Sequence, residues 1–160
     1  MTTADPAASP ALDAREALGR DDLGFLLAKA TQRWNELLAE RFAAAGYGDV
    51  RPSFGSVLLP LFEEDGVRMG ELARRARLSK QTMTEMVRRL EHGGLVERRV
   101  DPGDRRASLV FLTERSRAFE PIAAGVLREL DRFVRRRLDD ESVEELKTAL
   151  RELLSLGSES

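Results

Sequence analysis

Three polar residues are spaced so that they would share one face of a helix, namely Gln81, Thr84 and Arg88. From that face they could present hydrogen-bonding groups to a polar partner. A glutamine amide can pair with adenine through two hydrogen bonds, and a guanidinium can pair with guanine in the same way. This chemistry is recognition of a nucleic acid, although a merely solvated helix face has the same composition. The flanking residues suited to phosphate contacts are Ser79, Lys80, Thr82 and Arg89.

The sequence offers little for bond-breaking chemistry. It has no cysteine and a single histidine, His92, which excludes disulfides, thiolate metal sites and cysteine nucleophiles. No HExxH or GxSxG motif, phosphate-binding loop or pair of carboxylates in an apolar setting occurs. We therefore expect neither an enzyme nor a metal or cofactor site, and interpret His92 as a residue that offsets a helix dipole or packs locally.

The helix that would position the polar stripe begins at Ser79, a good N-cap residue. A shorter helix is predicted over residues 70–76, and Arg77 and Leu78 would connect it tightly to Ser79. The pattern is that of a helix-turn-helix. Apolar side chains at i, i+3, i+4 and i+7 predict the buried inner face of the second helix, namely Met83, Met86, Val87 and Leu90.

A β-hairpin is predicted after this helix, which Gly93 and Gly94 would end. Residues 95–100 and 107–112 have the composition of strands, and the loop between them contains Asp-Pro-Gly, which favours a turn. Residues 68–106 carry eleven Lys and Arg against six Asp and Glu, a net charge of +5, whereas the whole chain carries −2 and the remainder therefore −7. A helix-turn-helix, a two-stranded wing and concentrated positive charge together indicate a nucleic-acid-binding unit.

The run from Glu71 to Thr113 resembles the MarR family of winged-helix transcription regulators. Its ordered features are E-L-A-x-x-A-x-L-S-K-Q in the helix-turn-helix, D-P-x-D-R-R-A in the wing and a closing L-T. The resemblance covers roughly residues 21–156. It implies a mainly α fold with a small β-wing, in which a winged helix-turn-helix is flanked by helices of an intertwined dimerisation domain, and a short third strand at 67–69.

Glu85 departs from the commonest pattern of the family, in which a basic or neutral side chain often faces DNA at this position. A carboxylate there would repel phosphate. It would either accept a hydrogen bond from a cytosine amino group or orient Arg88 or Arg89, and we favour the orienting role.

The predicted wing loop, residues 101–106, places two aspartates beside two arginines. Asp101 or Asp104 can hold one guanidinium in a charge-assisted bond and stiffen the loop, while the other arginine reaches into the minor groove. The resemblance favours Arg105 at the tip and Arg106 as the internal brace. A solvated turn with surface salt bridges is the alternative.

The remaining chain is divided by composition and periodicity. Residues 1–20 are rich in Ala, Pro, Thr and Ser without a steady period, and we interpret them as a flexible leader. Residues 51–112 are predicted to form the winged helix-turn-helix domain. Its first helix would begin near Pro52, and Pro60 should kink or shorten it.

Residues 21–50 and 113–156 are predicted to form the helical dimerisation region. One helix would end at Gly46, and two others would begin after the N-caps Thr113 and Asp139. Their apolar stripes exceed what a small winged helix can cover, so we expect a second copy to bury them, with an intramolecular three-helix bundle as the alternative. The residues expected in the dimer contact are Leu23, Leu26, Leu27, Leu130, Phe133, Leu146, Leu150 and Leu153.

The predicted function is a homodimeric, sequence-specific double-stranded DNA-binding repressor whose recognition helices enter successive major grooves of a palindromic operator. The resemblance implies release by a small aromatic or phenolic effector, in a cleft that Trp34, Tyr47, Phe54 and Phe62 could line, although such aromatics also suit a core. A winged-helix protein–protein interaction module without specific DNA binding is the alternative, but it would not need the concentrated charge. No signal peptide or membrane span is predicted, so we expect a cytoplasmic protein.

Overall fold

A computed structural model of the chain describes residues 19–156, and nearly all of the predicted leader, residues 1–20, lies outside the described residues. The chain divides into two compact units, the first ending at Leu37 and the second beginning at Leu38. Within the described range, no helix is both long enough and apolar enough to cross a membrane.

Helix α2 (Leu23–Ala44) spans the boundary between the two units. Asp22 begins it, because its Oδ1 accepts hydrogen bonds from the backbone N–H groups of Gly24 and Phe25 at 2.8 and 3.2 Å. Gly46 ends it with a φ of +88°, a conformation that glycine adopts without strain. The helix therefore stops where the sequence predicted.

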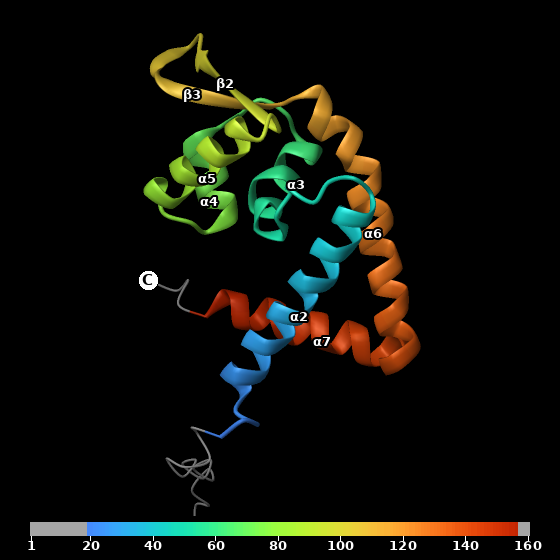
Figure 1. Ribbon diagram of the computed structural model, residues 1–160. Helices are drawn as coiled ribbons and strands as arrows, with labels where there is room; N and C mark the ends of the chain where they lie inside the picture. The colour runs from blue at the N-terminus through green and yellow to red at the C-terminus, as the bar shows by residue number, and fades with distance from the viewer. Residues whose placement is uncertain (1–18, 157–160) are drawn as a thin grey trace, which may run out of the picture. The chain divides into compact units, whose positions relative to one another are not determined.

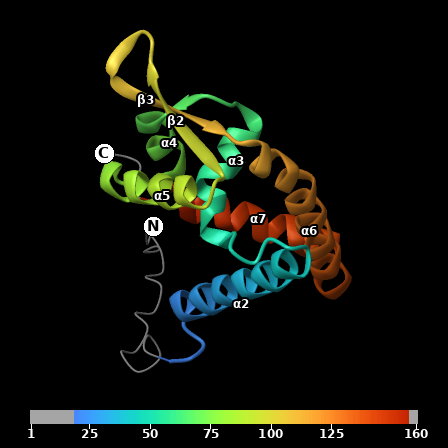
Figure 2. The ribbon, with the colours of Figure 1, turned by 45° about the horizontal axis from the view of Figure 1, so that its top comes forward.

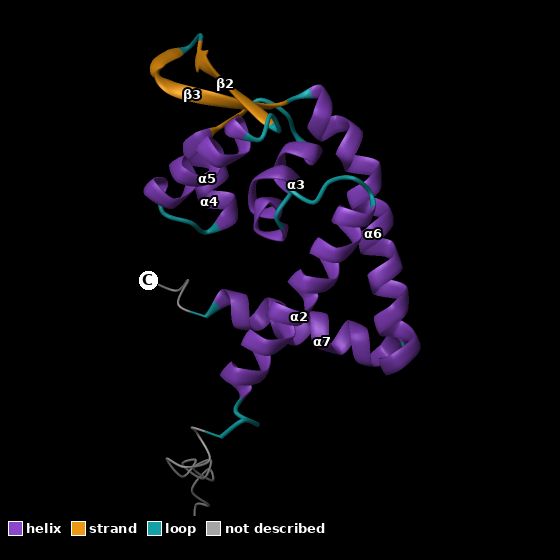
Figure 3. Ribbon diagram, viewed as in Figure 1, coloured by secondary structure: helices purple, strands orange, loops and turns teal. Residues whose placement is uncertain are grey.

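The second unit carries the helix-turn-helix and the wing (Figures 1 and 3). The predicted fold class, mainly α with a small β-wing, is confirmed. Its elements are the 3-10 turn η1 (Pro52–Phe54), the helices α3 (Gly55–Glu63), α4 (Met69–Ala76), α5 (Lys80–His92), α6 (Glu114–Leu138) and α7 (Asp140–Ser155), and the strands β1 (Val67–Arg68), β2 (Val96–Asp101) and β3 (Asp104–Leu112).

The core of the winged helix is formed by the inner face of α5. Met83, Val87 and Leu90 are fully buried, and Leu72 of α4 and Leu61 of α3 are buried with them. Each such side chain contributes about 1.5–3 kcal/mol by leaving water. The predicted inner stripe is therefore confirmed, except that Met86 remains partly exposed.

The connection between α4 and α5 is a tight left-handed turn. Arg77 adopts a φ of 52°, and the N–H of Leu78 donates to the carbonyl of Ala73 at 2.9 Å. Ser79 then begins α5, because its Oγ accepts the N–H of Thr82 at 3.1 Å.

The three strands form an antiparallel sheet in the order β1-β3-β2. The hairpin strands extend further than predicted and leave only Pro102 and Gly103 between them. This short turn is stabilised by Asp101, whose Oδ1 accepts the N–H of Gly103 at 2.8 Å. The pairing jumps from Val100 with Ser108 to Asp101 with Asp104, so residues 105–107 form a bulge in β3.

A sharp corner joins α6 to α7 (Figure 2). Asp139 occupies it with a φ of 65°, and its Oδ1 accepts the N–H of Ser142 at 2.8 Å. Arg135 lies one turn earlier and forms ion pairs with three carboxylates, which raise the pKa of its guanidinium. These are with Asp131 at 2.8 Å, Asp140 at 3.1 Å and Glu144 at 2.7 Å.

Candidate nucleic-acid interface

The outer face of α5 presents the predicted polar stripe to solvent. Gln81 is exposed, and Thr84 is partly exposed. The Thr84 hydroxyl donates to the carbonyl of Lys80 at 2.8 Å, so its remaining capacity is to accept a hydrogen bond. Ser79 and Thr82 lie 2.8 Å apart through their hydroxyl oxygens at the helix N-terminus, where backbone dipoles favour an anion.

The two arginines of α5 are held by Glu85 on the same helix. Arg89 donates from Nε to Oε1 of Glu85 at 3.1 Å, and Arg88 donates from Nη1 to Oε2 at 3.4 Å. All three side chains are exposed, so each pair stabilises the fold by about 1 kcal/mol at most. An orienting role for Glu85 requires such contacts with Arg88 and Arg89. The contacts are weak enough for either arginine to leave Glu85 and bind another anion.

Asp101 braces the wing through an arginine that sequence reasoning missed. Its Oδ2 lies 2.6 Å from Nη2 of Arg68 on β1, and the residue is only 6% exposed. The N–H of Gly103 and then the Arg68 guanidinium lower the pKa of the Asp101 carboxyl. The resemblance had assigned the bracing role to Arg106. Because the partner comes from a third strand instead, both arginines of the wing are released from that role.

Arg105 and Arg106 are exposed, and neither forms an ion pair with any carboxylate in residues 19–156. The Asp104 side chain accepts the backbone N–H of Arg106 through its Oδ1 at 3.0 Å. Arg106 lines a groove of about 540 Å³ together with Lys80 and Thr84 of α5. The wing and the N-terminal half of the recognition helix therefore meet around one basic groove.

The far end of α5 is fixed by the first turn of α6. Thr113, which caps α6, donates from Oγ1 to the carbonyl of Gly94 at 2.6 Å. Arg115 donates to the carbonyl of Gly93 at 2.6 Å and to Oδ1 of Asp49 at 2.7 Å. These contacts satisfy carbonyls at the C-terminus of the recognition helix and fix its position.

Asp65 fixes the base of the wing in a similar way. Its Oδ1 accepts the N–H of Leu112 at 2.8 Å, and its Oδ2 pairs with Arg117. Asp65, Arg68 and Arg115 were all missed from the sequence. No local pattern marks them, since these partners of Asp65 and Arg115 lie 22 to 66 positions away.

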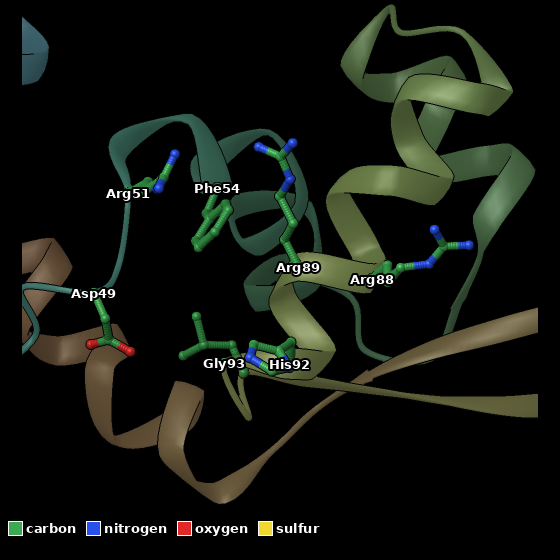
Figure 4. Close-up of a pocket in the computed structure, with 8 residues that line it drawn as sticks. Asp49, Arg51, Phe54, Arg88, Arg89, His92 and Gly93 are labelled. Atoms are coloured by element: carbon green, nitrogen blue, oxygen red, sulfur yellow. The ribbon is translucent and has the colours of Figure 1, made fainter.

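The aromatic residues proposed for an effector cleft are not gathered in one cavity. Tyr47 packs on Phe119 with ring centroids 5.0 Å apart, and Phe62 lines a small apolar void of about 70 Å³. Phe54 is buried and lines a different hollow, beside the C-terminal half of α5 (Figure 4). Trp34 belongs to the first unit, on the other side of the boundary at Leu37.

The residues proposed for the dimer contact differ in exposure. Leu130 is fully buried within this chain, so it is not available to a partner. Leu27 is half-buried. The exposed members are Leu23, Leu26, Phe133, Leu146, Leu150 and Leu153.

Comparison with known proteins identifies the family. The MarR family model matches residues 53–108. The chain is 34% identical over 93 residues to the HTH-type transcriptional repressor Rv2887 of Mycobacterium tuberculosis. The aligned residues cover 58% of this chain and 67% of that protein. It is 39% identical over 64 residues to the HTH-type transcriptional regulator TtmR of Methylorubrum extorquens, 40% of this chain but only 33% of TtmR.

Solved structures show the same fold. A probable transcriptional regulator from Pseudomonas aeruginosa aligns with a TM-score of 0.73 and 31% identity, over 83% of this chain and 97% of that one. A mutant of E. coli MarR complexed with operator DNA aligns with a TM-score of 0.73 and 27% identity, over 82% of this chain and 93% of that one. The chain belongs to the MarR family, and it is a transcriptional regulator rather than an enzyme.

Proposed function

We propose that this regulator is a homodimeric, cytoplasmic repressor that binds a palindromic double-stranded DNA operator and is released by a small aromatic or phenolic effector. The supporting observation is the convergence of Lys80, Thr84 and Arg106 around one groove. The recognition helix would enter the major groove, while Arg105 reaches into the adjacent minor groove. The MarR mutant solved with operator DNA supports operator DNA as the partner, and the name of Rv2887 supports repression.

Exposed apolar side chains support the homodimer. Phe133 and Leu138 on α6 and Leu146, Leu150 and Leu154 on α7 are each 36–62% exposed. Large apolar side chains left exposed in this number are characteristic of an interface between subunits. A two-fold dimer would place the recognition helices about 34 Å apart, which matches successive major grooves and makes the operator a palindrome.

An effector would require the structure to open. The apolar void beside Phe62 is about 70 Å³, whereas sites for small molecules usually exceed about 300 Å³. A ligand that separates Phe62 from Phe42 and Phe119, which line the same void, would move α6 and with it the attachment of the wing.

Selection of bound sequences from a random duplex pool tests the DNA-binding proposal. We expect a palindromic sequence with half-sites one helical turn apart, bound by two chains. Affinity for a random duplex should fall steeply with salt, because several phosphate contacts release counterions. A protein–protein interaction module would instead yield no selected sequence and a shallow salt dependence, and that result would refute the proposal.

A further inference from the structure

A serine lies close behind the two arginines of the wing. Ser108 follows Arg105, Arg106 and Ala107, and Leu109 comes next. No other serine or threonine of the chain has arginine both two and three positions before it. Serine/threonine protein kinases that select basic substrates read this charge pattern, because acidic side chains of the kinase pair with the two arginines. The wing therefore contains a recognition signal for such a kinase.

The side chains of this signal are accessible. Arg105 and Arg106 are exposed and form no ion pair with a carboxylate among the described residues. Ser108 is half-buried, and its hydroxyl forms no hydrogen bond with any described residue. Its oxygen is not enclosed by the protein and keeps contact with solvent. The hydroxyl is therefore free to react.

The backbone at Ser108 is paired on one side only. Ser108 pairs with Val100 of β2, whereas β1 reaches only Leu109 and Val110 of β3. The bulge at residues 105–107 interrupts the pairing just before Ser108. A strand with so few backbone partners opens at low cost, and an enzyme can bind it in its extended form.

Ser79 provides a comparison within the same chain. It is exposed and has Arg77 two positions before it, but an alanine three positions before it. Its Oγ also accepts the N–H of Thr82 at 3.1 Å as the cap of α5. Because Ser79 lacks the second arginine and its oxygen is engaged, we expect a kinase to modify Ser108 instead.

A phosphate on Ser108 would enter the groove between the wing and the recognition helix. Ser108 lines this groove together with Arg106 and Lys80. Glu71 is the only carboxylate among the lining residues, and two arginines of its own helix already pair with it and lower its pKa to about 2. A phosphate group carries about −1.5 to −2 charges at neutral pH and has three acceptor oxygens. It would occupy Arg106 and Lys80 in place of a DNA phosphate.

We propose that Ser108 is a phosphorylation site for a serine/threonine protein kinase that selects arginines, and that its phosphate closes the wing groove to DNA. The Ser108 oxygen bonds to the γ-phosphorus of ATP, and the bond from that phosphorus to the β,γ-bridging oxygen breaks. ADP leaves, and the hydroxyl proton passes to a base of the kinase. The effect on DNA rests on the proposed function, whereas the modification itself does not.

Phosphorylation of the folded, full-length chain tests the site. The probe is ATP with the catalytic subunit of cAMP-dependent protein kinase, which selects arginines before its serine. We expect about one phosphate per chain, and peptide mass spectrometry should place it on Ser108. Ser108→Ala should abolish the modification, whereas Ser155→Ala, at the exposed end of α7, should not. Arg105→Gln should slow it at least about tenfold, whereas Arg132→Gln, on the exposed surface of α6, should not.

An isolated peptide of residues 102–112 is the positive control, because it presents the same signal without the sheet. A full-length chain that stays unmodified while the peptide is phosphorylated would overturn the site, because the fold would then hide Ser108. Phosphate on Ser79 or another residue in place of Ser108 would do the same. An unchanged rate in Arg105→Gln would refute recognition through the arginines.

The effect on DNA is tested separately, with a random duplex. We expect phosphorylation to lower the affinity at least about tenfold and the salt slope by about two, and phosphatase treatment to restore both. Ser108→Ala should bind equally well before and after kinase treatment. Equal affinities of the phosphorylated and unphosphorylated wild type would overturn the regulatory role. A chain that binds no duplex in either form would refute the proposed function, while the mass spectrometry would still decide the site.

Discussion

The arginines of the wing and those of the recognition helix differ in what already holds them. Arg88 and Arg89 both donate to Glu85, whereas Arg105 and Arg106 have no carboxylate partner among the described residues, because Arg68 occupies Asp101. Arg105 and Arg106 can therefore bind an anion without breaking an internal ion pair, whereas Arg88 and Arg89 cannot. We infer that the wing supplies most of the non-specific affinity and that Glu85 makes helix binding depend on a matching base sequence.

The largest expected effect is on the wing. Arg105→Ala should weaken binding to both operator and random duplex at least about tenfold and reduce the salt slope by about one, without lowering dimer stability. Fluorescence anisotropy over a range of salt concentrations measures both quantities. Arg132→Ala, which changes an exposed residue of α6, is the matched control. Unchanged affinity would refute the minor-groove role of Arg105.

A smaller effect is expected when the brace is removed while both wing arginines remain. Asp101→Asn keeps the size of the side chain but removes its charge, so the pair with Arg68 is lost and the wing is less ordered before binding. DNA affinity should fall about threefold. Adding Arg68→Ala should change little further, because the two residues act as one pair. Additive losses in the double variant would show that Arg68 contacts DNA itself.

Releasing Arg88 and Arg89 from Glu85 should raise the affinity for DNA, whereas the two preceding changes lower it. Glu85→Gln removes the charge that holds Arg88 and Arg89 and that repels phosphate, so affinity for random duplex should rise about threefold. Affinity for the selected operator should rise less, and the ratio of the two affinities, measured by competition, should decrease. If the ratio increases instead, Glu85 obstructs specific binding and does not orient the arginines.

The smallest effect is the pH dependence of the brace. The pKa of Asp101 is lowered in the folded chain from an ordinary value of 3.8, so the brace contributes fully above about pH 4 and is lost as the pH falls below that value. The amide proton of Gly103, which donates to Asp101, should keep its chemical shift from pH 7 to about pH 4 and move at lower pH. Asp101→Asn should show no such transition. A transition near pH 5 would mean that the carboxylate is not stabilised.

The sequence predicted the local elements because their signals are local. The N-cap at Ser79, the stripe from Met83 to Leu90 and the glycines after α5 each act within one or two turns, and the structure has the helices where these signals indicate. The hairpin boundaries were less accurate, because a bulge and the Asp101 side chain shorten the turn.

The candidate site was only partly predictable, because its supporting contacts join distant elements. Asp101 was singled out in the sequence, but its partner, Arg68, lies on a strand of only two residues. Arg51 and His92 likewise line one hollow, although Arg51 precedes η1 and His92 lies at the end of α5. Periodicity specifies which face of an element is buried, whereas long-range pairing depends on how the elements pack.

The corner at Asp139 has a mechanical consequence. Helix α6 contains 25 residues, Pro121 among them, and spans roughly 37 Å between the corner and the wing. A rotation of about 5° at the corner would displace the far end of the helix by roughly 3 Å, close to the rise of one base pair. In the proposed dimer, the ion pairs of Arg135 would therefore help to set the distance between the two operator half-sites that the subunits can bind. A substitution of Arg135 would change this distance without altering any residue that touches DNA.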